Sequence, residues 1–366
     1  EKEKIIDLVK NSNFPAYYLK ICTYLDRSLS LTNSEQKTKV KLFKNNNNYY
    51  YQGYCNESIK NSIIENGDKI DYRDIFINHY HYNSKNETIN QKRKEKILTI
   101  KNQMSDTPLQ QKYLLGQEYF YSGNFKSAIS QFENIYSEIQ ENKNYSNIYY
   151  YLSLSYINKN NYNKAITILN QSKKLYPDFT DLFYLKGIVK YKQGEIENAK
   201  KIFYDCLNKG DAPWTKYNIT TGTGNYKSKI SLASIHLQQG NKEQSLKLYL
   251  ELSQNQVTFE KGIMGITQTH VKLDQLDILN QYLKENNLFF SKSFLIISRV
   301  LSHTGLYNKA LNYLEKSIQY QNDKNNKINS SDILNTIDQM IDSYQKQHLD
   351  TLPDNSKLKE IIKNQK

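Results

Sequence analysis

Hydrophobic residues between about 109 and 345 recur every three to four positions, the spacing that places side chains on one face of a helix. Between successive helical stretches a short element returns, with glycine or asparagine first and alanine or serine five positions later. Its five copies occupy residues 123–128, 160–165, 194–199, 240–245 and 305–310. The alanines of the first three copies are 37 and 34 residues apart. This period predicts a stack of helix–turn–helix units.

Two further positions support this prediction. A small residue in the first helix (Gly116, Ser153 or Gly187) would let the two helices of a unit approach closely. In the second helix a large residue stands four positions after the alanine or serine of the recurring element, on the same face of the helix. These large residues are Phe132, Leu169, Phe203, Tyr249 and Leu314. Residues 105–345 therefore resemble an array of about six tetratricopeptide repeats, with a degenerate copy between 255 and 287 and a charged tail at 346–366.

One segment interrupts the array. Residues 210–226 are rich in glycine and threonine and contain Trp214, the only tryptophan of the chain. Insertions in a solenoid lie along one edge and often touch a ligand or a neighbouring domain. Trp214 therefore has two interpretations: it fills a gap between helix pairs, or it belongs to a partner-binding surface.

The first hundred residues show a different period. Apolar and polar residues alternate over 38–43 and 72–80, and 16–25 is a short apolar run, which predicts three strands. Residues 57–65 and 86–104 are expected to be helical. Residues 1–104 thus form a small α/β block before a mainly α array. The block is too short for a complete mononucleotide-binding sheet, so we expect it to be the back end of a larger domain.

Composition excludes several classes of protein. The 366 residues carry a net charge of +13, but only four of the 50 basic residues are arginines and the lysines are spread along the chain, which argues against a nucleic-acid partner. No apolar run reaches the roughly 18 residues of a membrane span, and the charged residues 1–10 do not resemble a signal peptide. Three distant cysteines predict neither disulfides nor a zinc site, and favour a reducing, cytoplasmic compartment.

Sequence motifs for catalysis are sparse. The chain contains no GxGxxG, GxxxxGK, HExxH, GxSxG or Asp-x-Asp motif, so no self-sufficient active site is expected. The basic run at 92–96 would spread its charges around a helix, which indicates a solvated surface rather than a phosphate site.

The order of motifs in the N-terminal block resembles the closing part of a bacterial family 2 glycosyltransferase. The matching segments are residues 39–45, 51–59, 74–82 and 92–93, and the insertion matches a branch of that family that carries tetratricopeptide repeats. The resemblance covers about residues 14–320. It implies a GT-A-like domain, a nucleotide-sugar donor and Mg²⁺ or Mn²⁺, with the Asp-x-Asp motif expected upstream of Glu1. The chain by itself is then expected to be inactive.

Matching positions imply roles for single residues. His79 would complete the metal shell, with His81 as the second candidate, and Glu57 would be the catalytic-site carboxylate that orients the acceptor or a loop. The alternatives are a packing histidine at a strand end and a carboxylate that favours a helix N-terminus.

Lys41, Lys44, Asn56 and His81 would contact substrate. Asn56 stands where the family has histidine, and Lys44 where it has arginine. Exposed lysines on an edge strand also discourage aggregation.

Two functions remain open. In the first, the chain is the C-terminal part of an inverting glycosyltransferase whose repeats bind an acceptor protein or peptide, or form a homodimer. In the second, it is a non-enzymatic scaffold that grips a peptide in the concave groove of the repeats. Solenoid geometry places Tyr121, Tyr150 and Lys190 in that groove. Neither function involves nucleic acid or a membrane span.

Overall fold

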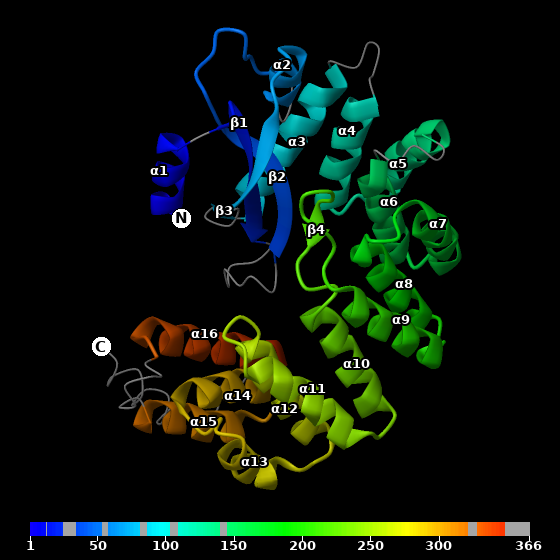
Figure 1. Cartoon of the computed structure of the whole chain (residues 1–366). Helices are drawn as coiled ribbons and strands as arrows, with labels where there is room; N and C mark the ends of the chain where they lie inside the picture. The colour runs from blue at the N-terminus through cyan, green and yellow to red at the C-terminus, as the bar shows by residue number, and fades with distance from the viewer. Residues whose placement is uncertain are drawn as a thin grey trace. The chain divides into compact units, whose positions relative to one another are not determined.

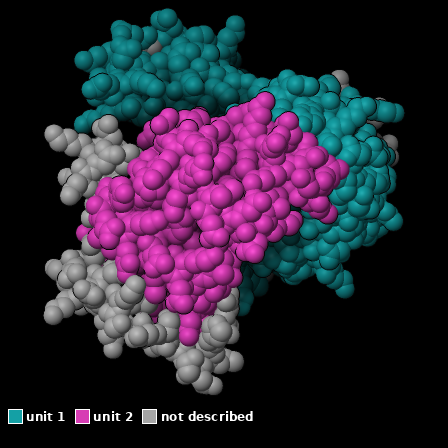
Figure 2. All heavy atoms as spheres, turned by 90° about the horizontal axis from the view of Figure 1, so that it is seen from below, with its two compact units in different colours: residues 1–228 teal, residues 229–366 magenta. Residues whose placement is uncertain are grey.

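The computed structural model divides into two compact units, residues 1–228 and 229–366, coloured teal and magenta in Figure 2. The residues that the structure describes are 1–11, 13–24, 34–52, 58–80, 86–102, 109–139, 145–320 and 328–347.

The first unit contains a mixed four-stranded sheet of order β3-β1-β2-β4 (Figure 1). β1 (Ala16–Tyr24) pairs antiparallel with β2 (Ser34–Phe43) and parallel with β3 (Ile70–Tyr80), as the alternating pattern predicted for three strands. The fourth strand, β4 (Ile219–Thr220), comes from the insertion in the repeats and extends the sheet antiparallel to β2.

Helices cover parts of this sheet. From α1 (Lys2–Lys10), which the sequence did not predict, Ile5 and Leu8 pack against a cluster around Tyr17 and Leu19. α2 (Lys60–Glu65) contributes Ile63 to a second cluster. The predicted helix at 57–65 therefore begins at Lys60 within the described residues, and 53–57 lie outside them.

Six repeat helices follow α3 (Asn86–Asn102) in the first unit and pair as the repeat period predicted. They are α4 (Leu109–Tyr121), α5 (Phe125–Ile139), α6 (Ser146–Asn158), α7 (Tyr162–Leu175), α8 (Thr180–Lys192) and α9 (Ile196–Lys209). The architecture is therefore a mainly helical repeat array preceded by a small mixed sheet.

Glycines set the spacing within two pairs. A Cβ at Gly116 would lie 2.6 Å from the Phe132 ring, and a Cβ at Gly187 would lie 2.6 Å from the Phe203 ring. Both phenylalanines are fully buried. The predicted reason for a small residue in the first helix is thus confirmed: it makes room for the aromatic ring of the second helix.

The residue between paired helices has a positive φ, as expected for a left-handed turn that ends the first helix. Glycine is replaced by Asn160, with a φ of 55°, and by Asp274 of the degenerate copy, with a φ of 53°. The glycine positions are Gly123, Gly194, Gly240 and Gly305.

The second unit continues the helical pairing. α12 (Phe259–Lys272), η3 (Leu276–Ile278) and α13 (Leu279–Glu285) correspond to the degenerate copy, whose second helix is short. The other helices are α10 (Tyr226–Gln238), which starts in the first unit, α11 (Lys242–Ser253), α14 (Ser291–His303), α15 (Tyr307–Gln319) and α16 (Ser330–Gln347). None of the helices in the described part of the chain combines the length and apolar character needed to cross a bilayer.

Candidate functional site

The insertion at 210–226 is folded by two aspartates. The Asp211 carboxylate accepts hydrogen bonds from the N–H groups of Gly222 (3.0 Å) and Gly224 (2.7 Å). Asp181, in the first turn of α8, accepts from the Thr220 N–H (2.5 Å) and the Thr223 hydroxyl (2.7 Å). The insertion is therefore a fixed loop that presents β4 to the edge of the sheet.

Trp214 joins the insertion to the sheet. Its ring lies 4.3 Å from the Lys20 ammonium and meets the Tyr72 ring edge-to-face, with 6.1 Å between centroids. Lys20 is nearly buried, and its ammonium also binds Asp74 at 2.7 Å. Trp214 packs against the hydrophobic core of the repeats as well. Trp214 thus fills space beside the helix pairs, and its other contacts are with the sheet of the same chain.

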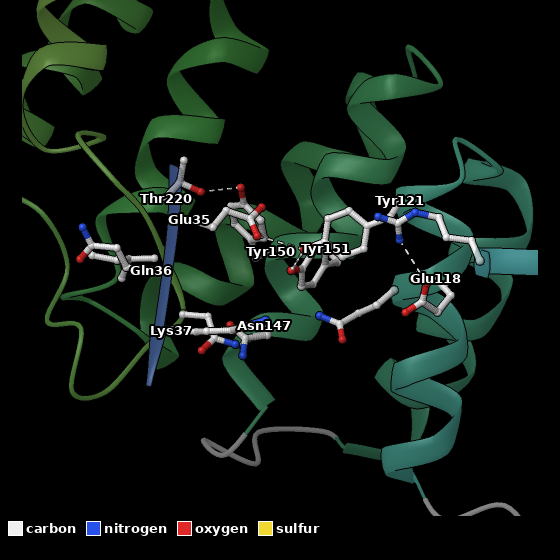
Figure 3. A pocket seen from close by; sticks show the side chains of 13 residues that line it. Glu35, Gln36, Lys37, Glu118, Tyr121, Asn147, Tyr150, Tyr151 and Thr220 are labelled. Carbon is white, nitrogen blue, oxygen red and sulfur yellow. Dashed lines mark hydrogen bonds and ion pairs between the residues drawn. The ribbon is translucent and has the colours of Figure 1, made fainter. Parts of the chain in front are cut away.

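A cavity of about 110 Å³ lies between β2, the repeat helices α4 and α6, and β4 (Figure 3). With α3, which contributes Arg93, five elements therefore enclose one small polar space. Its lining residues are Glu35, Gln36, Lys37, Arg93, Gln117, Glu118, Tyr121, Asn147, Tyr150, Tyr151, Asn218, Ile219 and Thr220.

Tyrosine hydroxyls connect the repeats to the sheet across this cavity. The Tyr121 hydroxyl donates to the Glu35 carboxylate at 3.0 Å and lies 2.8 Å from the Tyr151 hydroxyl. The Tyr150 hydroxyl lies 2.8 Å from the Thr220 hydroxyl of β4. Residues from the inner helices of two successive repeats thus hold β2 and β4 in place.

Opposite charges meet at a second wall. The Glu118 carboxylate binds Arg93 at 3.1 Å and Lys96 at 2.5 Å. Arg93 also lies over the Tyr121 ring, 5.1 Å from its centroid. Two members of the basic run at 92–96 therefore bind a carboxylate of the repeats, whereas Lys94 is exposed as predicted.

Burial sets the protonation of these groups. It raises the pKa of the Glu35 carboxyl, an effect that the Tyr121 hydrogen bond and Lys37 partly oppose. Burial, and next the Glu35 charge, also raises the pKa of the Tyr150 and Tyr151 phenols, so these hydroxyls remain donors throughout the physiological pH range. The Lys37 ammonium, also half-buried, has a lowered pKa for the same desolvation reason.

The cavity wall also has an unused acceptor. The side-chain oxygen Oδ1 of Asn147, on α6, is buried and has no hydrogen-bond partner among the described residues. A buried acceptor without a partner costs about 1–3 kcal/mol, so its position in the wall of a cavity suggests a ligand that donates to it.

The structure brings together only some of the predicted residues. Tyr121 and Tyr150 line the cavity, but Lys190 does not: its ammonium binds Glu195, in the turn after its own helix, at 2.7 Å. The partner-binding role of all four predicted residues, Trp214 included, stays a prediction.

His79 lies near the end of β3, where its Nδ1 is 3.4 Å from the Thr23 hydroxyl. Burial lowers its pKa, and the charges of Lys37, Lys39 and Lys41 lower it further. The parts of the chain described here hold no group of three or more His, Cys, Asp or Glu side chains able to bind a metal.

Of the other predicted substrate residues, Lys41 is exposed on β2 and Lys44 follows that strand. Asn56, Glu57 and His81 lie outside the described residues, so their assigned roles stay predictions.

The sequence did not point to Glu35, Lys37 or Asn147. Only the three adjacent tyrosines at 149–151, in an inner helix, indicated a binding surface near this cavity. Glu35 and Asn147 belong to elements that meet through tertiary packing, which leaves no trace in local spacing.

Comparison with protein families finds repeats in both units. A family model described as "Anaphase-promoting complex, cyclosome, subunit 3" matches residues 122–206, and one described as "Tetratricopeptide repeat" matches 291–324. The chain therefore contains tetratricopeptide repeats. Neither match reaches the residues before 122, so the resemblance of the sheet to glycosyltransferases stays a prediction. None of the curated proteins compared with the chain matches it.

Several solved structures are similar at low identity. A signal-transduction ATPase with a tetratricopeptide-repeat sensor from Pyrococcus horikoshii is 13% identical over 75% of this chain and 44% of its own, with a TM-score of 0.43. A chain of the Cut9–Hcn1 hetero-tetramer of the anaphase-promoting complex is 14% identical over 68% of this chain and 47% of its own, with a TM-score of 0.40. YrrB, described as a tetratricopeptide-repeat protein with an unusual peptide-binding site, is 15% identical over 54% of this chain and 95% of its own, with a TM-score of 0.32. Likenesses at this level do not identify a function.

Proposed function

We propose that the chain is a protein-binding repeat module that recognises a peptide segment at the cavity between β2, α4 and α6. The observation that carries this proposal is the buried, unpartnered Oδ1 of Asn147 in the cavity wall. A peptide supplies N–H donors along its backbone, and the tyrosine rings that line the same cavity offer apolar contact with polar tips. The cavity is small, so it would hold one side chain or a turn of the bound segment.

An array of short synthetic peptides, probed with the labelled full chain, tests this proposal. We expect Asn147→Leu to weaken the retained peptide spots roughly tenfold or more, because the donor of the peptide loses its acceptor. The free energy of unfolding should change by only about 1 kcal/mol, since the substitution also removes an unpaired buried oxygen.

The matched control is Lys126→Leu, an exposed position on the second helix α5, outside the cavity. It should leave the peptide spots unchanged. Equal binding by the wild type and Asn147→Leu, or no retained peptide at all, would contradict the proposal.

Glycosyl transfer is the second candidate, favoured by the lysine charges beside His79. Lys37, Lys39 and Lys41 make this end of the sheet electropositive, which suits a nucleotide diphosphate. The described residues provide no metal-binding cluster, so no catalytic step through Mg²⁺ or Mn²⁺ is assigned. Release of nucleoside diphosphate from nucleotide-sugars by the full-length protein tests this candidate. Turnover unaffected by His79→Ala would remove His79 from the reaction. This second proposal also includes an acceptor protein or peptide as substrate, a homodimer and a cytoplasmic location.

A further inference from the structure

Strand β2 has a free edge beyond its pairing with β4 (Figure 1). β4 pairs only with Glu35 and Gln36, whereas β2 continues to Phe43. The Ser34 carbonyl accepts from the Thr221 N–H on this edge, at 3.3 Å. Since backbone groups alternate between the two edges of a strand, the N–H and C=O groups of Thr38 and Val40 point to the same edge. Among the described residues no strand pairs there.

A hollow of about 360 Å³ is lined by this part of β2 and extends over the face of the sheet, since Tyr72, Tyr18 and Val40 in its lining are neighbours across β3, β1 and β2. Thr38, Lys39, Val40 and Lys41 all line it. Because side chains of successive strand residues alternate between faces, a lining with four in a row means that the hollow touches the backbone of β2 as well as one face of the sheet. Its other walls are Thr215 and Lys216 of the insertion, Ser58–Lys60, and the rings of Tyr18, Tyr51 and Tyr72.

The charge of the hollow has one sign. Its lining contains four lysines and no acidic residue. Only Lys216 binds a carboxylate within the described residues, that of Asp178 at 2.7 Å. Burial lowers the pKa of Lys39, and the charges of Lys37 and Lys41 lower it further, so positive charge is crowded along the strand.

Aromatic rings form the apolar part of the hollow. The Tyr18 and Tyr72 rings are stacked with 4.6 Å between centroids, and the Lys60 ammonium lies 6.0 Å from the Tyr18 centroid. Lysines alone would be explained as a guard against unwanted strand pairing. A hollow with stacked tyrosines and walls from two other segments needs a different explanation.

We propose that the free edge of β2, residues 37–43, binds an extended acidic segment of a partner protein. The segment adds a strand beside β2, in line with β4, and its backbone pairs with Thr38 and Val40. Acidic side chains on one face of the segment lie against Lys39 and Lys41, while the residues between them face Lys60 and the tyrosines. This surface is separate from the cavity at Asn147, so either proposal can fail without the other.

Fluorescence anisotropy of the full chain with a labelled peptide of alternating glutamate and valine tests the proposal. The variant Lys39→Glu/Lys41→Glu should weaken binding roughly tenfold or more, because like charges then face each other. The control Lys159→Glu/Lys174→Glu makes the same charge change at exposed positions of the repeats and should bind within about twofold of the wild type.

A second peptide separates strand addition from simple charge attraction, and it does not depend on the folding of any variant. Methylation of alternate backbone nitrogens keeps the charge of the peptide but removes the donors that a ladder needs. We expect this peptide to bind at least roughly tenfold more weakly. Equal binding of both peptides, no binding of the first, or its displacement by inorganic pyrophosphate at constant ionic strength would overturn the proposal.

Discussion

Single residues fix the distance between paired helices. Gly116 and Gly187 occupy the same position in two repeats, and in each the phenylalanine ring of the partner helix occupies the place where a Cβ would be. This relation could be predicted from the sequence because it depends on spacing within one repeat. Asn147 could not be predicted in the same way, because its environment depends on Tyr121 of another repeat and on a strand more than a hundred residues earlier.

Gly187→Ala tests the close contact. Its Cβ would enter the space of the buried Phe203 ring, and overpacking of this kind costs about 1–3 kcal/mol. The better helix propensity of alanine returns less than about 1 kcal/mol, so we expect net destabilisation. Urea denaturation followed by circular dichroism measures it.

A double-mutant cycle with Phe203→Leu provides the control for this prediction. The smaller side chain should relieve part of the cost of Gly187→Ala, which gives a favourable interaction energy between the two substitutions. Additive effects would show that the clash is not what destabilises the variant.

At the scale of elements, the repeat helices were predictable, whereas α1 and the fourth strand were not. The repeat helices flank a local pattern that recurs in five copies. β4 has only two residues and no alternating pattern, and its partner strand β2 lies far earlier in the sequence. Its conformation depends on Asp181 and Asp211, whose carboxylates bind the backbone of the insertion. Tertiary hydrogen bonds of this kind leave no periodic signal in the sequence.

Asp181 makes the stability of the insertion depend on pH. Burial raises its pKa from 3.8 to about 7. The folded state therefore binds this proton more tightly than the unfolded chain does, and the contribution of Asp181 to stability falls as pH rises from about 4 to about 7. Relative to the wild type, Asp181→Asn should become more stable over this window by up to a few kcal/mol.

Urea denaturation of both proteins at pH 4.5 and pH 7.5 measures this difference. Asp205→Asn, on the exposed face of α9, is the matched control and should show little change between the two pH values. A constant difference between Asp181→Asn and the wild type would mean that Asp181 titrates at the same pH in the folded and unfolded states.

At the scale of the whole molecule, charge is the property that composition alone could predict. The net charge of +13 comes from lysines along the entire chain, and several of them crowd on β2. The sequence did not predict the division into two compact units, although its boundary after residue 228 closely follows the insertion at 210–226 that interrupts the repeats. The boundary predicted at 104–105 separates motifs, and it remains a prediction.

Self-repulsion should make the folded chain sensitive to salt. We expect the melting temperature to rise by a few degrees between roughly 0.02 M and 0.3 M sodium chloride at pH 7, as the lysine charges are screened. Differential scanning calorimetry measures the shift. Near pH 10 the lysines lose charge and the shift should shrink. An equal shift at both pH values would point to a salt effect that is independent of net charge.

The pairing of Glu35 with Thr220 also has a consequence for synthesis on the ribosome. At roughly 5–20 residues per second, the partner of Glu35 is made about 10–40 seconds after Glu35 itself. During this interval the nascent chain carries β2 without β4, while α4 to α9 form behind it. The lysines of β2 would then keep neighbouring nascent chains apart until the insertion arrives.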